Sequence, residues 1–239
     1  PPFSGCDDFG LSASMHPAKE VGGDFYDFFL IDQDHCGVVI ADVSGKGVPA
    51  ALFMMRVKAL LNQLLREDLS PDQVLARAND GLCEDNEAGM FVTVWLGVLD
   101  LRSGKLVYAN GGHNPPLYRH ADGSVEWMRD RSGLLLGSFE GVPYRVFERT
   151  MIRGDSLILY TDGVTEAMDA SDHCYGDERL FQLVERECDG YPASVSGVIE
   201  EDVRAFAEGA DQADDITLLV LRYDGQENGP AASAAGNRG

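Results

Sequence analysis

The sequence lacks the features of membrane-spanning, zinc-binding and disulfide-stabilised proteins. None of its apolar runs approaches the roughly 18 residues that a membrane helix needs, and no signal peptide is visible. Its five cysteines are scattered and include no Cys-x-x-Cys pair. This spacing argues against a disulfide framework or a cysteine-ligated zinc site, and it favours a reducing cytosol. We therefore expect a cytoplasmic protein without membrane insertion.

Basic residues are also scarce. The chain has 19 Lys and Arg against 40 Asp and Glu, which gives a net charge of −21. Nucleic acids and anionic membranes are therefore poor candidates as partners, because this charge repels both. Bound metal ions would offset part of the acidic excess.

The chain shows no internal repeat and no internal linker, and its 239 residues can bury a sizeable core. We expect one domain over residues 1–224. The Gly-, Ala-, Ser- and Asn-rich tail over residues 225–239 has no periodicity, which predicts disorder. Because the chain begins at Pro1 without a Met, we expect a domain cut from a longer protein.

Hydrophobic patterning predicts many strands and two pairs of helices. The predicted strands cover residues 9–15, 25–31, 36–42, 91–100, 105–110, 116–119, 125–129, 144–152, 156–160 and 216–223. Most neighbours are joined by short turns and predict hairpins, including 144–152 with 156–160 across Arg153-Gly154-Asp155. The predicted helices cover residues 47–66, 70–85, 177–188 and 194–208, with caps at Ser70 and Ser194. Because helices and strands do not alternate, we expect an α+β fold of two stacked antiparallel sheets flanked by helical layers.

The helix predicted over residues 47–66 has an ambiguous face. Its second half has a polar arc that includes Lys58 and Asn62, but Leu52 and Met55 fall on the same side in the first half. One interpretation is burial of Leu52 and Met55 under another helix. The other is a surface for a partner or a regulatory segment.

Aspartates recur where predicted strands begin or end. Asp42 follows the apolar run 37–41, and Asp24, Asp162 and the pair Asp214-Asp215 lie near strand ends elsewhere. A single Asp after Gly is commonly a turn or cap residue. Four such sites together indicate a shared cluster, and oxygen ligands without neighbouring His or Cys favour Mg²⁺ or Mn²⁺ over Zn²⁺. The working hypothesis is a two-metal hydrolase in which Asp42, on the most apolar strand, bridges the ions.

Five motifs in a fixed order carry a family resemblance. They are Val21-Gly22-Gly23-Asp24-Phe25-Tyr26-Asp27, Asp42-Val43-Ser44-Gly45-Lys46-Gly47, Asn110-Gly111-Gly112-His113-Asn114-Pro115-Pro116, Tyr160-Thr161-Asp162-Gly163-Val164 and Asp214-Asp215-Ile216-Thr217. Together they resemble the bacterial sporulation stage II protein E-type phosphatases of the metal-dependent protein phosphatase superfamily. Each motif is modest alone, but five in register over residues 9–223 are highly specific.

The resemblance implies a sandwich of two antiparallel sheets between helical layers, in agreement with the fold inferred above. It implies hydrolysis of phosphoserine or phosphothreonine on a small regulatory protein by a water that two Mn²⁺ or Mg²⁺ ions activate. In that family the phosphorylated partner is often an anti-sigma-factor antagonist of the STAS type, so we expect a role in sigma-factor regulation by partner switching. We also expect an N-terminal sensor domain outside this sequence, and the helix over 47–66 as a regulatory or homodimer surface.

The resemblance also implies roles for the aspartates. Asp42 would bridge the two metals, and the carbonyl of Val43 would bind one of them. Asp162 and Asp214 would complete the second site, while Asp24 would hold the first metal directly or through water. Adjacent side chains of a strand point to opposite faces, so only one acid of Asp214-Asp215 can face the metals. The family pattern assigns that place to Asp214, with Asp215 in a supporting, hydrogen-bonding role.

Four further polar residues lie in or near the motifs: Lys19, Asp27, Ser44 and His113. Lys19, five residues before Asp24, lies where a basic side chain could reach the substrate phosphate, and a solvated surface lysine is the alternative. We expect Asp27 to be a supporting residue and His113 to fix a loop rather than act as a general acid. Many eukaryotic relatives place a His two residues after the bridging Asp, where this chain has Ser44. The proton donor for the leaving group is therefore unassigned.

Three competing interpretations fit the sequence less well. Gly45-Lys46-Gly47 after a strand is similar to a P-loop, but Val48 replaces its metal-binding Ser or Thr and residue 40 is Ile rather than Gly. Gly22-Gly23-Asp24-Phe25 is similar to a diguanylate cyclase signature but lacks the acidic residue expected after Asp24. A catalytically silent binding module is the alternative from a different class. The presence of all four aspartates counts against it, and metal-dependent turnover would discriminate the two.

Overall fold

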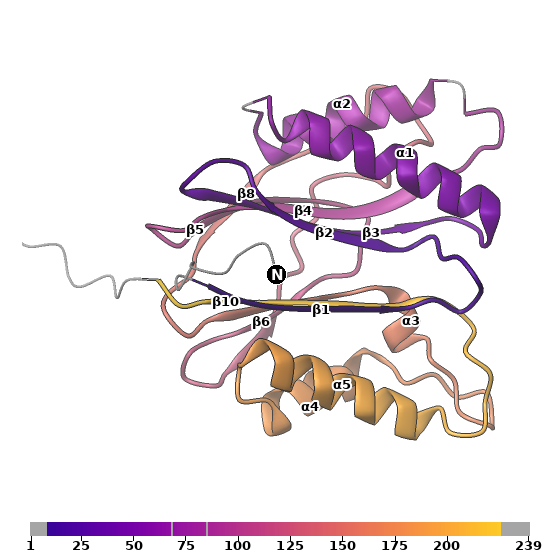
Figure 1. Cartoon of the computed structure of the whole chain (residues 1–239), viewed down its shortest axis with the longest axis vertical. Helices are drawn as coiled ribbons and strands as arrows, with labels where there is room; N and C mark the ends of the chain where they lie inside the picture. Colours follow the sequence, from indigo (N-terminus) through magenta and orange to yellow (C-terminus); the bar gives the residue numbers. More distant parts are fainter. Residues whose placement is uncertain (1–8, 68, 85, 226–239) are drawn as a thin grey trace, which may run out of the picture.

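Two five-stranded antiparallel sheets lie face to face, and helices cover the outer side of each (Figure 1). The computed structural model describes residues 9–67, 69–84 and 86–225. The predicted α+β class, two stacked antiparallel sheets between helical layers, is confirmed. Apart from Gly225, the tail for which we predicted disorder lies outside the described residues.

The first sheet carries the motif that begins at Asp42. Its order is β2-β3-β4-β5-β8, with bounds β2 (Phe25–Leu30), β3 (His35–Val43), β4 (Val92–Asp100), β5 (Lys105–Gly111) and β8 (Phe147–Thr150). Strand β3 lies between β2 and β4 and is buried on both faces, which explains its continuous apolar run. The predicted hairpin of β2 and β3 is confirmed, and Phe25 pairs with Ala41. This register brings Asp24 close to Asp42.

The second sheet joins the two ends of the domain. Its order is β1-β10-β9-β6-β7, with bounds β1 (Phe9–His16), β10 (Ile216–Tyr223), β9 (Ser156–Tyr160), β6 (Leu117–Arg119) and β7 (Val125–Trp127). Strands β1 and β10 pair along their whole length, from Phe9 opposite Tyr223 to His16 opposite Ile216. The first strand therefore forms an edge of this sheet and pairs with the last strand, β10.

The predicted hairpin between residues 144–152 and 156–160 is wrong. Strand β8 pairs with β5 in the first sheet, whereas β9 lies between β10 and β6 in the second. The chain crosses between the sheets at Asp155, whose carboxylate accepts hydrogen bonds from the Tyr118 hydroxyl and from the backbone N–H groups of Ala121 and Ile152. A Gly-Asp turn thus anchors a crossing between sheets instead of closing a hairpin.

The helices differ from prediction mainly at their ends. Helices α1 (Val48–Leu64) and α2 (Pro71–Cys83) cover the first sheet, and α4 (Asp177–Glu187) and α5 (Pro192–Phe206) cover the second (Figure 1). The capping box of Ser70 with Gln73 is confirmed, but the cap predicted at Ser194 is wrong. Helix α5 starts earlier because Pro192 suits a first-turn position, which leaves Tyr191 as the cap. A short helix that we did not predict, α3 (Asp162–Thr165), follows β9 directly.

Three apolar layers alternate with the four layers of secondary structure. One lies between α1, α2 and the first sheet, one between the two sheets, and one between the second sheet and α4 and α5. The central layer contains Trp95 and Tyr223, which are fully buried. Within the described ranges, every helix is too short or too polar to span a lipid bilayer.

One face of α1 is apolar and open to solvent. Val48, Leu52 and Met55 are 64%, 68% and 59% exposed, whereas Val57 and Leu61 on the opposite face are buried against α2 and the first sheet. The interpretation that Leu52 and Met55 are buried under another helix is therefore wrong. Their use as a partner surface stays a prediction.

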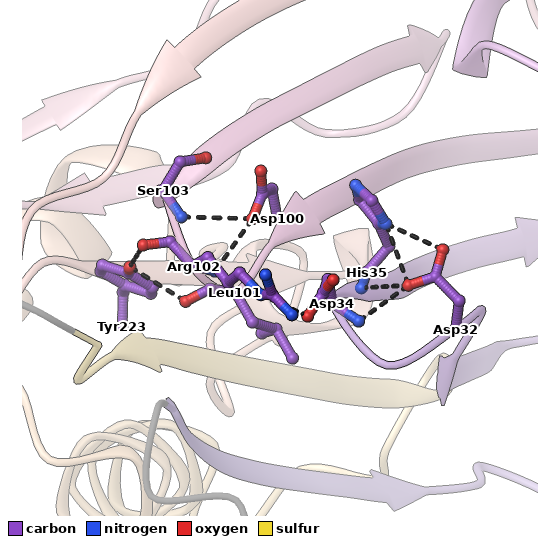
Figure 2. Close-up of polar contacts among 8 residues, drawn as sticks. All are labelled: Asp32, Asp34, His35, Asp100, Leu101, Arg102, Ser103 and Tyr223. Atoms are coloured by element: carbon purple, nitrogen blue, oxygen red, sulfur yellow. Dashed lines mark hydrogen bonds and ion pairs between the residues drawn. The ribbon is translucent and has the colours of Figure 1, made fainter.

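At one end of the sandwich, polar contacts join the β2–β3 turn, the β4–β5 turn and the end of β10 (Figure 2). Arg102, in the β4–β5 turn, donates to the Asp34 carboxylate in the β2–β3 turn at 2.6 Å, and Leu101 N–H donates to the Asp34 carbonyl at 2.7 Å. The Tyr223 hydroxyl, at the end of β10, donates to the Leu101 carbonyl at 3.1 Å. These contacts join the two sheets at this end of the sandwich.

Candidate active site

Four aspartates predicted to act together lie at the end of the sandwich opposite those turns. Asp42 is the last residue but one of β3, and Asp24 directly precedes β2. Asp162 opens α3 two residues after the end of β9, and Asp214 lies two residues before β10. Two of the four come from the first sheet and two from the second, so the candidate site spans both.

The chain turns sharply after Asp42 to enter α1. Gly45 and Gly47 have φ angles of +86° and +77°, in the left-handed region that favours glycine. Gly47 caps α1, and Pro49 occupies its first turn, where the missing N–H costs no helical hydrogen bond. The tight turn keeps Asp42 and Lys46 at the same end of the sheet.

Asp24 is the most deeply buried of the four carboxylates. It is 2% exposed, and its Oδ2 accepts hydrogen bonds from the Thr161 and Thr217 hydroxyls, each at 2.7 Å. Burial raises the pKa of Asp24, repulsion from Asp215 and Asp162 adds to the rise, and the two hydroxyls oppose it. A buried carboxylate held between strands β9 and β10 thus links the first sheet to the second.

The other carboxylates repel one another. Burial, then repulsion from Asp24, Asp162 and Asp214, raises the pKa of Asp42, and a hydrogen bond to the Asp24 carboxyl contributes. The pKa of Asp162 is raised by burial and by repulsion from Glu166 and Asp214. Burial and mutual repulsion therefore both disfavour the charged forms of Asp24, Asp42 and Asp162. In the part of the chain that the structure describes, however, no group of three or more acids, imidazoles or thiols is arranged to coordinate a metal ion.

Asp214 faces a lysine that the sequence analysis did not assign to the site. Its Oδ2 lies 2.8 Å from Nζ of Lys46, which also donates to the Ala213 carbonyl. Both side chains are partly exposed. Lys46 therefore ties the turn after β3 to the segment before β10, and it places a positive charge among the four acids.

Asp215 points away from Asp214 and binds backbone. Its Oδ1 accepts from Ala18 N–H at 2.8 Å, and its Oδ2 accepts from Gly23 N–H at 2.8 Å and from Asp24 N–H at 3.4 Å. The carboxylate of Asp215 therefore fixes the loop that carries Asp24. The hydrogen bonds expected for Asp215 are present in the structure.

The donor groups fit a hard divalent cation by their chemistry. They are carboxylate oxygens together with the carbonyl oxygen of Val43. This carbonyl oxygen lies so close to Gly23 that a Cβ atom on residue 23 would be 2.9 Å from it. The carboxylates of Asp24 and Asp42 have raised pKa values, and Asp214 already attracts the ammonium of Lys46. A bound cation would reduce the repulsion among these carboxylates. Metal ligation by Asp24, Asp42, Val43, Asp162 and Asp214 stays a prediction.

Lys19 and Asp27 lie apart from this contact network. Lys19 is exposed, and among the described residues it forms no ion pair. Asp27 Oδ2 accepts from the Asn62 amide at 2.7 Å and lies 3.6 Å from Nζ of Lys58, so Asp27 connects β2 to α1. Its contacts are those of a supporting residue.

His113 joins the two sheets beside the site. Thr93, which pairs with Asp42 across β3 and β4, lies 2.9 Å from Nδ1 of His113, and the Tyr160 carbonyl lies 3.1 Å from Nε2. Burial lowers the pKa of His113 to about 4, so the imidazole is neutral at pH 7 and its Nε2–H donates to Tyr160. Both ring nitrogens are engaged, as expected for a residue that fixes a loop.

Ser44 is also engaged, which leaves the leaving-group proton donor unassigned. Its hydroxyl accepts from Phe91 N–H at 2.9 Å, and its own N–H donates to the Phe91 carbonyl at 2.9 Å. Ser44 therefore fixes the turn after β3.

Sequence reasoning missed Lys46, Thr161 and Thr217. All three lie inside the quoted motifs, next to residues that were assigned roles. Their motif membership was the available signal, but their contacts join segments more than 50 residues apart and depend on the packed sheets.

Comparisons with known proteins agree with this fold. Phosphoserine phosphatase RsbU of Bacillus subtilis is 30% identical over 212 residues, which are 89% of this chain and 62% of that protein. The solved SiaA-PP2C domain of Pseudomonas aeruginosa superposes with a TM-score of 0.80 at 21% identity, covering 90% of this chain and 86% of that one. The catalytic domain of the serine/threonine phosphatase PstP, solved with two manganese ions, gives 0.63 at 16% identity, covering 90% and 97%.

The model of the family described as stage II sporulation protein E matches residues 32–224. This match includes Asp42, Asp162 and Asp214 and begins after Lys19 and Asp24. The chain spans less than two thirds of the length of RsbU. The chain belongs to the stage II sporulation protein E family.

Proposed function

We propose that this chain is a metal-dependent protein serine/threonine phosphatase that hydrolyses phosphoserine or phosphothreonine on a small regulatory protein. The observation that carries the proposal is the meeting of Asp24, Asp42, Asp162 and Asp214, from both sheets, at one end of the sandwich. Family membership and the likeness to RsbU, which is named a phosphoserine phosphatase, support the same reaction.

The proposed cofactors are two Mn²⁺ or Mg²⁺ ions, for which PstP provides a precedent in the same fold. When bound, such ions lower the pKa of a water and neutralise charge on the phosphoryl oxygens. Asp42 is proposed to bridge them, with the Val43 carbonyl and Asp24 at the first site. Asp162 and Asp214 are proposed to complete the second.

Neighbouring residues orient these ligands and the substrate. The Thr161 and Thr217 hydroxyls both donate to one oxygen of Asp24, and the Asp24 carboxyl also interacts with that of Asp42. Asp215 holds the loop before β2 through three backbone N–H groups. Lys46 contacts Asp214, and we propose that it binds a phosphoryl oxygen. The sequence offered this role to Lys19, with a solvated surface lysine as the alternative.

The proposed substrate is a phosphorylated anti-sigma-factor antagonist of the STAS type, within a cytoplasmic partner-switching pathway. An N-terminal sensor domain outside this sequence is proposed to regulate the phosphatase, and a homodimer through α1 is proposed as one means of doing so. The exposed Leu52 and Met55 support a partner surface on that helix.

Turnover of p-nitrophenyl phosphate with and without Mn²⁺ and chelator tests the reaction. We expect activity only with the metal, and we expect Asp42→Asn to reduce it to background while the circular dichroism spectrum is unchanged. Full activity in excess chelator, or in Asp42→Asn, would exclude the two-metal reaction. Absence of turnover with Mn²⁺ on both the ester and a phosphorylated STAS protein would favour the catalytically silent binding module.

A further inference from the structure

A large groove lies beside the candidate active site. It has a volume of about 740 Å³ and runs between α3, the C-terminal part of α5 and the segment before β10. This volume falls within the roughly 300–1,000 Å³ that ligand pockets have in proteins. Its floor is apolar and is formed by Val164, Val203 and Leu218, side chains of the layer between the second sheet and its helices.

The groove is continuous with the site. Asp214 and Lys46, which form the ion pair described above, belong to its lining, as does Gly163 next to Asp162. A chain whose phosphate lies at Lys46 and Asp214 therefore leads directly into the groove. A small phosphate ester has no part that extends so far.

The walls of the groove are acidic. Two permanently cationic side chains line it, Lys46 and Arg204. Against them stand six carboxylates, those of Glu166, Glu200, Glu201, Glu208, Asp211 and Asp214. Lys46 is already paired with Asp214, and His16 lies 3.6 Å from Glu200. Among the described residues, Glu201 and Glu208 form no ion pair, and both are exposed at the α5 side of the groove.

We propose that this groove binds the segment of the substrate protein that flanks its phosphorylated residue, and that this segment carries apolar side chains and at least one Lys or Arg. The proposal rests on the proposed phosphatase function. The apolar floor would bury aliphatic side chains of the segment, and the unpaired carboxylates of Glu201 and Glu208 would attract its basic side chain. The groove would thus select among phosphoproteins by their flanking sequence.

Two phosphoserine peptides test the proposal. They are identical except that one has two lysines, and the other two glutamates, within four residues of the phosphoserine. The double variant Glu201→Gln/Glu208→Gln is compared with Glu185→Gln/Glu187→Gln on α4, which removes the same charge outside the groove. Hydrolysis of p-nitrophenyl phosphate, which has no flanking segment, is the reference for each protein. Values of kcat and KM are measured separately for each substrate.

We expect the native protein to prefer the lysine peptide through a lower KM. In Glu201→Gln/Glu208→Gln, the ratio of kcat/KM for the lysine peptide to kcat/KM for the glutamate peptide should fall about three- to tenfold, while kcat/KM for p-nitrophenyl phosphate is unchanged. This range corresponds to the loss of one or two exposed ion pairs. The α4 variant should keep the preference. Equal kinetics of both peptides with the native protein, or equal losses in the two double variants, would overturn the proposal.

A steric variant provides a second, independent test. Ala205 is exposed on α5 and lines the groove, so Ala205→Trp should fill part of it without disturbing the core. We expect a higher KM for both peptides and unchanged kinetics with p-nitrophenyl phosphate. If Ala205→Trp lowers turnover of all three substrates equally, the groove acts on the reaction centre rather than on the flanking segment, and the proposal fails. If no substrate is turned over with Mn²⁺, the phosphatase function itself fails, and the groove proposal with it.

Discussion

The Asp215 carboxylate accepts a hydrogen bond from the backbone N–H of Gly23 at 2.8 Å, between residues 192 positions apart in the chain. The same carboxylate binds Ala18 N–H, so one side chain before β10 fixes the loop that leads into β2. Its neighbour Asp214 instead faces Lys46 at the candidate site. Adjacent acids of one motif thus have different partners, and this difference leads to a test.

Asp214→Asn and Asp215→Asn should have distinct effects. We expect Asp214→Asn to lose the second metal and most turnover, because a neutral amide is a poor ligand for a hard divalent ion. We expect Asp215→Asn to keep metal affinity and lose less activity. It should lower the free energy of unfolding by about 2 kcal/mol, since hydrogen bonds to a charged acceptor are weakened.

Titration with Mn²⁺ and urea denaturation of both variants measure these effects. Loss of the second ion in Asp215→Asn, with its retention in Asp214→Asn, would reverse the assignment.

The raised pKa values of Asp24 and Asp42 predict an unusual pH dependence for the metal-free protein. A carboxyl whose pKa is higher in the folded than in the unfolded chain binds more protons when folded. Its contribution to stability is therefore lost progressively as pH rises above about 4. We expect Asp42→Asn to raise the melting temperature of metal-free protein by a few degrees at pH 8 and to change it little at pH 4.

Differential scanning fluorimetry in chelator at the two pH values measures this effect. In the native protein, Mn²⁺ should restore the lost stability at pH 8, because a ligand of the folded state stabilises it. Equal melting temperatures of Asp42→Asn and native protein at pH 8 in chelator would contradict the mutual repulsion described above.

His113 provides a third prediction. Its pKa of about 4 lies below the ordinary value of 6.5, so the folded protein binds fewer protons than the unfolded chain between these pH values. The contribution of His113 to stability is therefore complete above pH 6.5 and is lost as pH falls toward 4. We expect its imidazole resonances not to titrate above pH 5 by NMR.

The variant His113→Phe should cost about 3 kcal/mol of unfolding free energy at pH 7, because Thr93 and the Tyr160 carbonyl lose their partner. The pH dependence of activity should keep its shape in His113→Phe. An NMR titration midpoint near 6.5 would show an exposed imidazole and contradict its placement between the sheets.

Much of this fold could be predicted because its signals are local. The apolar run before Asp42, the β2–β3 turn and the Ser70–Gln73 capping box each depend on residues within a few positions of one another. The pairing of 144–152 with 156–160 failed for the opposite reason. The Gly154-Asp155 turn is compatible with a hairpin, and only the distant Tyr118 and Ala121 show that Asp155 anchors a crossing between sheets.

The candidate site was predictable to the same extent. Strand-end aspartates are visible in sequence, and the register of β2 with β3 explains the approach of Asp24 to Asp42. The hydroxyls of Thr161 and Thr217 reach Asp24 only through the stacking of one sheet on the other. No local pattern encodes that contact.

The exposed apolar face of α1 predicts an interaction surface. Met55→Glu should lower the oligomer mass or change activation, because a charge in an apolar interface must be desolvated. Metal affinity should be unchanged, since the substitution leaves the β3–α1 turn intact. Light scattering and turnover are measured together. If neither changes in Met55→Glu or Leu52→Glu, the face is inert and the dimer or regulatory role is excluded.

The last prediction concerns which lysine binds the phosphate. Lys46 contacts Asp214 at 2.8 Å, whereas Lys19 is exposed and lies outside the contacts that join the four aspartates. We expect Lys46→Gln to raise the inhibition constant of inorganic phosphate about tenfold, which is the loss of one charge-assisted hydrogen bond. Lys19→Gln should have a smaller effect. Lys105→Gln, which removes a lysine paired with Glu148 at the opposite end of the first sheet, is the matched control.

Metal affinity separates this role from a structural one. Removing a positive charge beside Asp214 should leave Mn²⁺ affinity unchanged or higher while phosphate binding weakens, because the two ligands have opposite charge. If Lys46 only positions the turn after β3, both affinities should fall together in Lys46→Gln. If Lys19→Gln shows the larger loss of phosphate binding, the cation that faces the phosphate comes from the loop before β2, which was one of the two roles considered for Lys19 from the sequence.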